Sequence, residues 1–254
     1  MHIMEGMLPH GWAAFWWVLT AIILIVGIFQ LNKLVRNNRE VLPLMAVSGA
    51  FIFVLSSLKL PSVTGSSSHP TGTGLSSFTF GPAITAVLSA IVLLFQALFL
   101  AHGGISTLGA NCFSMGFFGP LLAWSLYKML QKTNIHIYFT VFLAAFVADL
   151  GTYILTSIQL ALAHGIPKGS WFGLLDSLLN FSFDLAATYG MDILTGFMGS
   201  LPGYLGVFAL TQIPLAIIEG LIIVVAFKYI AKIKGEFFTK SNTITEEQLN
   251  KINA

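Results

Sequence analysis

The sequence predicts an all-α integral membrane protein, a polytopic helical bundle of about seven transmembrane helices. Two observations carry this prediction. The 254-residue chain is 56% hydrophobic and only 9% charged, with a mean hydropathy of +0.85, whereas about a quarter of an ordinary soluble domain is charged. The chain also contains a series of apolar runs long enough for the roughly 20-residue helix that crosses a bilayer core. Lipid must therefore cover much of its surface.

Six apolar runs qualify as spans, and a seventh is weaker. Residues 171–199 are apolar but carry three aspartates, so this segment is either a further span or a re-entrant or interfacial helix. No soluble domain separates from the runs, so residues 1–254 are expected to form a single membrane domain with a polar tail at 230–254. The six clear runs cover residues 12–31, 43–58, 82–101, 107–127, 138–163 and 203–229.

Basic residues orient the chain, because loops rich in Lys and Arg tend to stay in the cytoplasm. Basic residues follow the first span and none precedes it, which predicts an outer N-terminus: Lys33, Arg36 and Arg39. Lysines also follow the last span, which predicts a cytoplasmic tail. An odd number of spans is then required, and this favours residues 171–199 as the sixth of seven. Lys128 and Lys132 would fall on the outer side, against the rule.

The segment 59–80 differs from the rest of the chain. It reads KLPSVTGSSSHPTGTGLSSFTF, and its Gly, Ser, Thr and Pro content predicts irregular chain rather than helix. Irregular backbone near membrane depth is tolerated only where protein buries it or where it lines a cavity. The segment is therefore either an extracytoplasmic binding loop that carries His69 or an exterior linker.

The N-terminus can chelate a metal. His is too bulky to favour removal of the initiator, so Met1 should stay and offer its α-amine beside the amide and imidazole of His2. These three nitrogens close adjacent chelate rings in one plane, and His69 can supply the fourth in-plane ligand. An all-nitrogen site disfavours Mg²⁺ and Ca²⁺, which prefer oxygen, and favours Ni²⁺, Cu²⁺ or Co²⁺.

Hydroxyl groups near His69 are candidates to orient its ring by hydrogen bonding: Ser66, Ser67, Ser68 and Thr71. The other histidines are expected to have structural roles. His102 lies in AHGGISTLGAN at the end of a span, where helix capping is the expected role, and the rest are expected at the membrane interface: His10, His136 and His164.

Two acidic residues, Asp149 and Glu219, lie inside apolar spans. A charge near the centre of a spanning helix costs about 2.5–3.5 kcal/mol on insertion scales, so each needs a partner or a role. Either they belong to a proton pathway, or each bonds a neighbouring helix and holds the bundle together. The second interpretation is favoured, because no chain of acidic residues connects them.

Several motifs of enzymes are missing from the sequence. There is no G-x-x-x-x-G-K-[ST] phosphate loop and no H-E-x-x-H zinc motif. No G-x-S-x-G elbow is present, and the single Cys112 excludes a multi-cysteine metal site. The chain is therefore not expected to be an enzyme, and any ATP that it uses must be hydrolysed by separate subunits.

Five motifs together resemble the CbiM family, the substrate-binding membrane components of energy-coupling-factor cobalt transporters. They are MHIMEG, KLPSVTGSSSHPTGTG, AHGGISTLGAN, ADLGTYILTSIQLALA and QIPLAIIEGL, and they occur in the family's order. The resemblance covers residues 1 to about 163 and about 205 to 228. Residues 164–204 look longer than the family pattern. In the family a cleavable signal peptide often precedes the Met-His start, and a start at Met1 fits either a mature form or a gene without that signal.

The resemblance implies a bound Co²⁺, or Ni²⁺ as the nearest rival, as transported substrate and not as a cofactor. It implies ligands from Met1, His2 and His69, and a six-helix core with one added N-terminal helix. It also implies the cell membrane of a prokaryote and four partner proteins: a small accessory membrane protein, a transmembrane coupling protein, and two cytoplasmic ATPases. Ala46 and Ala50 fit the Ala-x-x-x-Ala pattern with which such components dock the coupling protein.

Two other functions stay open on the sequence. A self-sufficient secondary transporter or channel would depend on Asp149 or Glu219 and would need no ATPase. An intramembrane hydrolase would use a serine in the 64–68 stretch with His69.

Overall fold

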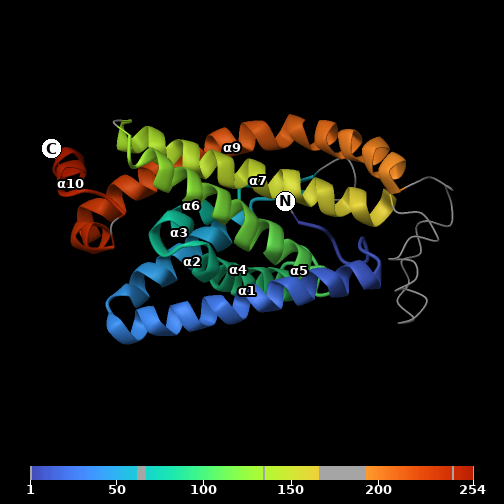
Figure 1. The fold of residues 1–254 in the computed structure, drawn as a ribbon, viewed down its shortest axis with the longest axis horizontal. Helices are drawn as coiled ribbons and strands as arrows, with labels where there is room; N and C mark the ends of the chain where they lie inside the picture. The colour runs from blue at the N-terminus through green and yellow to red at the C-terminus, as the bar shows by residue number, and fades with distance from the viewer. Residues whose placement is uncertain (1, 62–66, 134, 166–192, 242, 254) are drawn as a thin grey trace.

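The structure, a computed structural model, describes residues 2–61, 67–133, 135–165, 193–241 and 243–253. These residues are nearly all helical (Figure 1). The short strands β1 (Leu60–Pro61) and β2 (Ser67–Ser68) pair antiparallel. The helices are α1 (His10–Asn37), α2 (Val41–Ser57), α3 (Thr73–Phe80), α4 (Pro82–Phe99), α5 (Leu108–Asn111), the π-helix η1 (Cys112–Phe118), α6 (Gly119–Leu130), α7 (Ile137–Gly165), α9 (Ile193–Lys240) and α10 (Glu246–Asn253).

The predicted helical membrane protein is confirmed. Within the described residues, α1, α4, α7 and α9 are long and apolar enough to cross a membrane, and α2 is a shorter apolar helix. Large apolar side chains point outward from these helices, such as Phe29 on α1, which is 70% exposed, and Leu210 on α9, which is 82% exposed. Such surfaces are compatible with lipid and not with water.

Helices α7 and α9 form a long antiparallel pair. The rings of Tyr153 and Phe208 meet near one end, with centroids 6.2 Å apart. Asp149 receives hydrogen bonds from Gln212 one turn further along α7. In Figure 1 the two helices lie side by side, and α7 ends where α9 begins.

The bundle has two ends, which we name by their contents. The histidine end holds residues 2–9, the C-terminal ends of α2, α4 and α7, and the start of α9. The tail end holds the C-terminal ends of α1, α6 and α9 together with α10. In Figure 1 the histidine end lies on the right and the tail end on the left.

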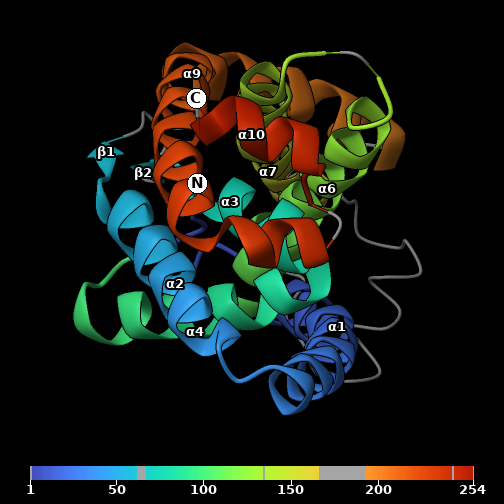
Figure 2. The same cartoon turned by 90° about the vertical axis from the view of Figure 1, so that its left-hand side faces the viewer.

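The segment that links α2 to α4 in the sequence crosses the bundle, although its hydropathy does not predict a span. The two helices run parallel, because Met45 packs near Ile84 at the tail end while Ser56 bonds Gln96 at the histidine end. The segment 67–80 therefore returns from one end to the other, first as extended chain and then as α3. Every residue of α3 is buried, and Figure 2 shows this helix near the centre, with α2, α4, α6, α7 and α9 around it.

This crossing corrects two predictions from the sequence. Residues 73–80 are helical and buried, so the expected irregular outer loop is wrong for that part. The described residues already pass through the bundle in alternating directions along α1, α2, the segment 67–80, α4, α5 to α6, α7 and α9. The segment 67–80 is thus one of an odd number of passes made by the described residues. Of the predicted span 171–199, residues 171–192 lie outside the described part and residues 193–199 belong to the start of α9.

The side assigned to Lys128 and Lys132 was also wrong. Near them, the side chain of Gln131 donates to the Thr243 carbonyl at 2.8 Å, which puts the end of α6 beside the tail. These lysines therefore lie at the same end as the basic residues that follow α1 and α9. The apparent exception to the charge rule arose because the pass at 67–80 was not counted.

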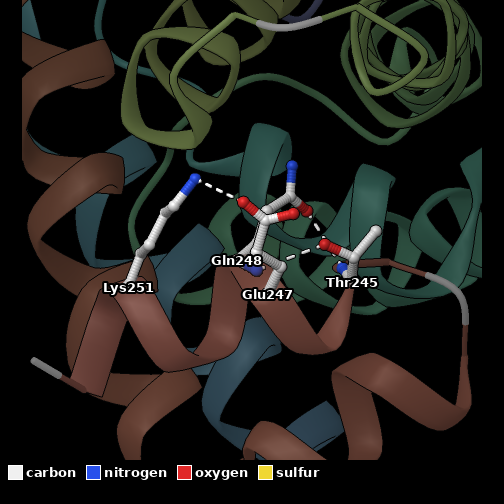
Figure 3. A network of polar contacts seen from close by, with 4 residues as sticks. All are labelled: Thr245, Glu247, Gln248 and Lys251. Atoms are coloured by element: carbon white, nitrogen blue, oxygen red, sulfur yellow. Dashed lines mark hydrogen bonds and ion pairs between the residues drawn. The ribbon is translucent and has the colours of Figure 1, made fainter.

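The tail is ordered by its own hydrogen bonds (Figure 3). Thr245 and Gln248 form a reciprocal capping box at the start of α10, with bonds of 3.0 and 3.2 Å. Glu247 and Lys251 pair one turn apart on the exposed face. The sequence predicted a polar tail, and the structure adds that α10 packs Leu249 against Gly235 of α9.

Candidate metal-binding site

Residues 2–8 insert into the bundle at the histidine end. The side chains of His2, Ile3 and Leu8 are buried there. The amide of Asn111 holds the Ile3 backbone on both sides, since Ile3 N donates to Oδ1 at 2.7 Å and Nδ2 donates to the Ile3 carbonyl at 3.0 Å. The hydroxyl of Thr107 donates to the same carbonyl at 2.8 Å. These bonds fix the backbone next to His2, so its imidazole has a defined position.

The segment 101–111 forms a cradle for this N-terminal strand. Gly103 has a φ of +81° and faces His2, and a Cβ placed there would lie 3.1 Å from Cδ2 of the His2 ring. A side chain at this position would therefore strain the backbone and push the ring. Further along, the backbone N–H of Ser106 donates to the Glu5 carboxylate at 3.1 Å. The main contacts of the motif AHGGISTLGAN are thus with the N-terminal segment.

His69 presents one nitrogen to His2. Its Nδ1 lies 2.9 Å from the Pro70 carbonyl, which can only accept, so Nδ1 carries the proton and Nε2 has a free lone pair. That Nε2 lies against Nδ1 of His2. In the absence of a metal, the Nδ1 proton of His2 fills this contact, and a metal ion that replaces the proton would meet a lone pair from each ring.

A third ring completes the cluster. His102 lies with its ring centroid 4.3 Å from that of His2 and 5.0 Å from that of His69. All three rings are buried, and one ligand nitrogen from each lies within 4.8 Å of the others. The group is a set of convergent nitrogen donors with no carboxylate among them, which suits a transition metal better than Mg²⁺ or Ca²⁺.

The rings are kept neutral by their surroundings. Burial lowers the pKa of His2 well below its usual value, and the neighbouring rings of His69 and His102 act in the same direction. Burial also lowers the pKa of His102, to about 4. Neutral imidazole is the form that binds metals, so the two rings are ready to act as ligands near neutral pH.

Two buried carboxylates support the turn that carries His69. Glu219 on α9 accepts from the backbone N–H of Thr71, from its hydroxyl at 2.8 Å, and from the N–H of Gly72 at 2.9 Å. Gln212 donates to the His69 carbonyl at 3.2 Å and to both oxygens of Asp149 at 2.8 Å. Both acids therefore act on the loop, Glu219 directly and Asp149 through Gln212.

The structure brings only some of the predicted site residues together. His2 and His69 come together, while Met1 and Ser66 lie outside the described residues. Ser68 bonds Thr211 at 2.8 Å and not the His69 ring. Thr71 bonds Glu219, and Ser67 belongs to β2. The partner of the His69 ring is instead the Pro70 carbonyl, so the hydroxyls of Ser68 and Thr71 do not have the expected role.

Sequence reasoning missed several residues of the site. His102 was expected to cap a helix, and its backbone N–H does bond the Gln96 carbonyl at 3.1 Å, but its ring faces His2. Asn111, Gly103 and Gln212 were not singled out. The signal available for Gly103 and Asn111 was the motif AHGGISTLGAN, in which polar and glycine residues interrupt a run of apolar chain, and Gln212 opens the motif QIPLAIIEGL.

The expected bundle contact of Asp149 is present, since Gln212 belongs to the neighbouring helix α9. Glu219 differs, because it bonds a loop and not a helix. The small residues Ala46 and Ala50 are exposed on α2. They line an open apolar groove of about 450 Å³ between α1, α2 and α4.

Comparisons with known proteins agree on a single family. The family described as "Cobalt uptake substrate-specific transmembrane region", CbiM, matches residues 2–237. A putative cobalt transport protein CbiM 1 of Methanosarcina barkeri is 51% identical over 99% of this chain and 98% of its own length. A putative cobalt transport protein CbiM 2 of Methanosphaerula palustris is 49% identical over 99% and 96%.

A more distant relative and a solved structure extend this pattern. The cobalt transport protein CbiM of Chlorobium limicola is 47% identical over 97% of this chain and 87% of its own length. The crystal structure of a truncated transition metal transporter superposes with a TM-score of 0.72 at 23% identity, covering 91% of this chain and 99% of that one. At that identity the likeness concerns the fold.

Proposed function

Since the chain belongs to the CbiM family of cobalt uptake membrane proteins, we propose that it is the metal-capturing, substrate-binding component of an energy-coupling-factor transporter. Co²⁺ is held by four nitrogens, namely the α-amine of Met1, the amide and Nδ1 of His2, and Nε2 of His69. The ion is the transported substrate and not a cofactor.

One observation supports this proposal above the others. Nδ1 of His2 and Nε2 of His69 face each other in a buried, carboxylate-free pocket, although the residues are 67 positions apart in sequence. Nδ1 is the nitrogen that closes a chelate ring with the backbone amide of the same residue. The chelate takes up three adjacent in-plane positions, and Nε2 of His69 is the proposed fourth ligand because it contacts Nδ1 of His2. Such a planar set suits Co²⁺ or Ni²⁺, and the family favours cobalt.

The proposed orientation places the histidine end outside the cell membrane of a prokaryote and the tail end in the cytoplasm. Basic residues gather at the tail end, after α1, at the end of α6 and along the last part of α9. Among the described residues, Lys59 lies at the histidine end. This distribution follows the positive-inside rule without the exception noted above. Metal would therefore be captured outside and occluded by the segment 59–80.

The proposed partners are a small accessory membrane protein, a transmembrane coupling protein and two cytoplasmic ATPases. The groove that contains Ala46 and Ala50 is the proposed docking face for the coupling protein, because small residues four apart let helices approach closely. ATP hydrolysis belongs to the partners, which agrees with the missing phosphate loop. The hydrogen bonds of Asp149 and Glu219 favour anchoring of the His69 turn over an ion pathway of a self-sufficient transporter.

The decisive experiment inserts one extra residue before Met1 and measures binding of Co²⁺ and Ni²⁺ by calorimetry, with metal content per protein. The insertion moves the α-amine out of the chelate and leaves every side chain in place. We expect affinity to fall by more than about a hundredfold, beyond the range for loss of an outer partner of a ligand. The control adds the same residue after Ala254. Unchanged affinity and stoichiometry in the N-terminal variant would show that the proposed site is wrong.

A further inference from the structure

The backbone around His102 is shaped to direct this ring. Ala101 has a φ of +46°, in the left-handed region that residues other than glycine rarely adopt. Gly103 on the other side has a φ of +81°. The His102 N–H bonds the Gln96 carbonyl at 3.1 Å, which ends α4 and fixes the turn. An unfavourable backbone conformation maintained by its surroundings often marks a functional position.

The rings of His69 and His102 lie equally close to the ring of His2. The centroids are 4.3 Å apart in both pairs, and the planes differ by 45° for His69 and by 37° for His102. The rings of His69 and His102 stand at 81° to each other, with centroids 5.0 Å apart. In the proposed function, Met1, His2 and His69 fill the four positions of a square plane around the metal. A nitrogen of His102 can then reach the metal only from the apical side.

From this geometry we propose that His102 supplies a fifth, apical nitrogen ligand, and that this ligand selects Co²⁺ over Ni²⁺. The inference rests on the proposed function, because the in-plane ligands must bind first. The ligand nitrogens of His2, His69 and His102 lie within 4.8 Å of one another, so one ion can serve all three after small side-chain movements.

The number of d electrons on each metal explains the proposed selectivity for Co²⁺ over Ni²⁺. Low-spin Co²⁺ in a square plane of strong nitrogen donors has one electron in the orbital that points along the apical axis, so a fifth nitrogen binds well. Low-spin Ni²⁺ has two electrons in that orbital, which repel an apical donor and keep the ion four-coordinate. An apical imidazole therefore stabilises the cobalt complex and contributes little to the nickel complex, since metal geometry decides between ions with similar ligand preferences.

The test is electron paramagnetic resonance of the full chain loaded anaerobically with Co²⁺. One apical ¹⁴N should split each cobalt line along the apical axis into a triplet. The triplet should persist in His136→Ala, which removes an exposed histidine at the other end of the bundle, and should vanish in His102→Ala. In wild-type protein labelled with ¹⁵N-histidine, each cobalt line should split into a doublet instead. This measurement identifies a histidine ligand without any mutation. A wild-type spectrum with no apical nitrogen splitting, or a triplet retained in His102→Ala, overturns the proposal.

Affinities give the second readout. His102→Ala and the larger His102→Gln should lower Co²⁺ affinity by about tenfold, the lower end of the effect of losing a partner at a metal site, and should change Ni²⁺ affinity by much less. Equal losses for both ions would mean that His102 only positions His2, which overturns the selectivity. The two proposals fail differently. The proposed function fails if the wild-type chain binds neither ion, or if the N-terminal insertion leaves metal affinity unchanged. The apical ligand alone is refuted if the His102 variants keep the wild-type Co²⁺ affinity and still lose it on N-terminal insertion.

Discussion

The two ends of the bundle bury different kinds of groups. At the tail end, aromatic rings fill the core, with Phe78 stacked on Tyr127 at 4.8 Å and Phe227 packed edge-on at 5.7 Å. At the histidine end, the buried groups include imidazoles, hydroxyls, amides and the backbone of non-helical chain. Packing of aromatic rings dominates the core of the tail end, while hydrogen bonds to buried polar groups dominate the histidine end.

This difference shows how a membrane protein can keep irregular chain inside a bundle. Backbone groups without water must be satisfied internally, and here side chains of distant helices do so. Asn111 pairs with the strand at Ile3, Glu219 with the turn at Thr71 and Gly72, and Gln212 with the carbonyl of His69. The histidine end therefore has a defined shape without regular secondary structure, and this is where the ligand nitrogens converge.

Replacing His69 with Ala should give the largest change in metal binding. The variant removes the proposed fourth in-plane ligand, so Co²⁺ affinity should fall by more than about a hundredfold. Helix content measured by circular dichroism should stay the same, because the ring contacts other site residues and no core side chain of the tail end. The matched control is His136→Ala at the tail end. If His69→Ala still binds Co²⁺ with the wild-type affinity, the histidine cluster is not the site of metal capture.

Replacing Glu219 with Ala should affect both stability and binding. It leaves the N–H groups of Thr71 and Gly72 buried without an acceptor, which costs roughly 2–6 kcal/mol at about 1–3 kcal/mol each. Metal affinity should fall by about tenfold to a hundredfold, because the turn that carries His69 loses its anchor. Glu219→Gln keeps one acceptor and should show a smaller loss on both measurements. If the two variants behave alike, the carboxylate is not the anchor of the turn.

Replacing Gly103 with Ala should weaken metal binding through crowding of His2. Gly6 provides a matched control, because its φ of +79° is close to the +81° of Gly103 while nothing lies within 4 Å of a Cβ built on it. Both variants carry similar backbone strain of about 1–2 kcal/mol. Only Gly103→Ala should also lower Co²⁺ affinity, by about tenfold. Equal affinities in the two variants would show that the cradle does not set the position of the His2 ring.

The smallest effect is expected at the tail end. Tyr127→Phe removes the hydroxyl that donates to the Thr243 carbonyl at 2.7 Å, and that carbonyl keeps its bond from Gln131. The loss in free energy of unfolding should be about 1 kcal/mol, measured by denaturation in mixed micelles. Metal affinity should not change. A change of affinity here would mean that the two ends are coupled more strongly than their separate cores suggest.

Much of the fold could be predicted from the sequence, because the lipid environment sets the length of apolar helices. The predicted spans match α1, α2, α4, α5 to α6, α7 and part of α9, with differences of a few residues at most ends. The crossing at 67–80 could not be predicted in this way. It is too polar for a hydropathy window, and it is tolerated only because its hydroxyls and backbone are satisfied by side chains such as Glu219 and Gln212.

The candidate site was predictable in part for a similar reason. The chelating potential of Met1 and His2 follows from local chemistry, and the loop with one histidine offered His69. The position of His102 depends on the turn at Ala101 and Gly103, which sequence spacing does not reveal. The roles of Asn111 and Gln212 depend on contacts across more than a hundred residues, which only the packed structure brings together.

The contact between Ile3 and Asn111 also has a consequence for how the protein is made. The two residues are 108 positions apart, and a ribosome adds about 5–20 residues per second. Ile3 therefore waits roughly 5–20 seconds for Asn111 to be synthesised. The turn at Thr71 waits still longer for Glu219, which follows it by 148 positions. Residues 2–8 thus reach their final place only after the chain that receives them has been made.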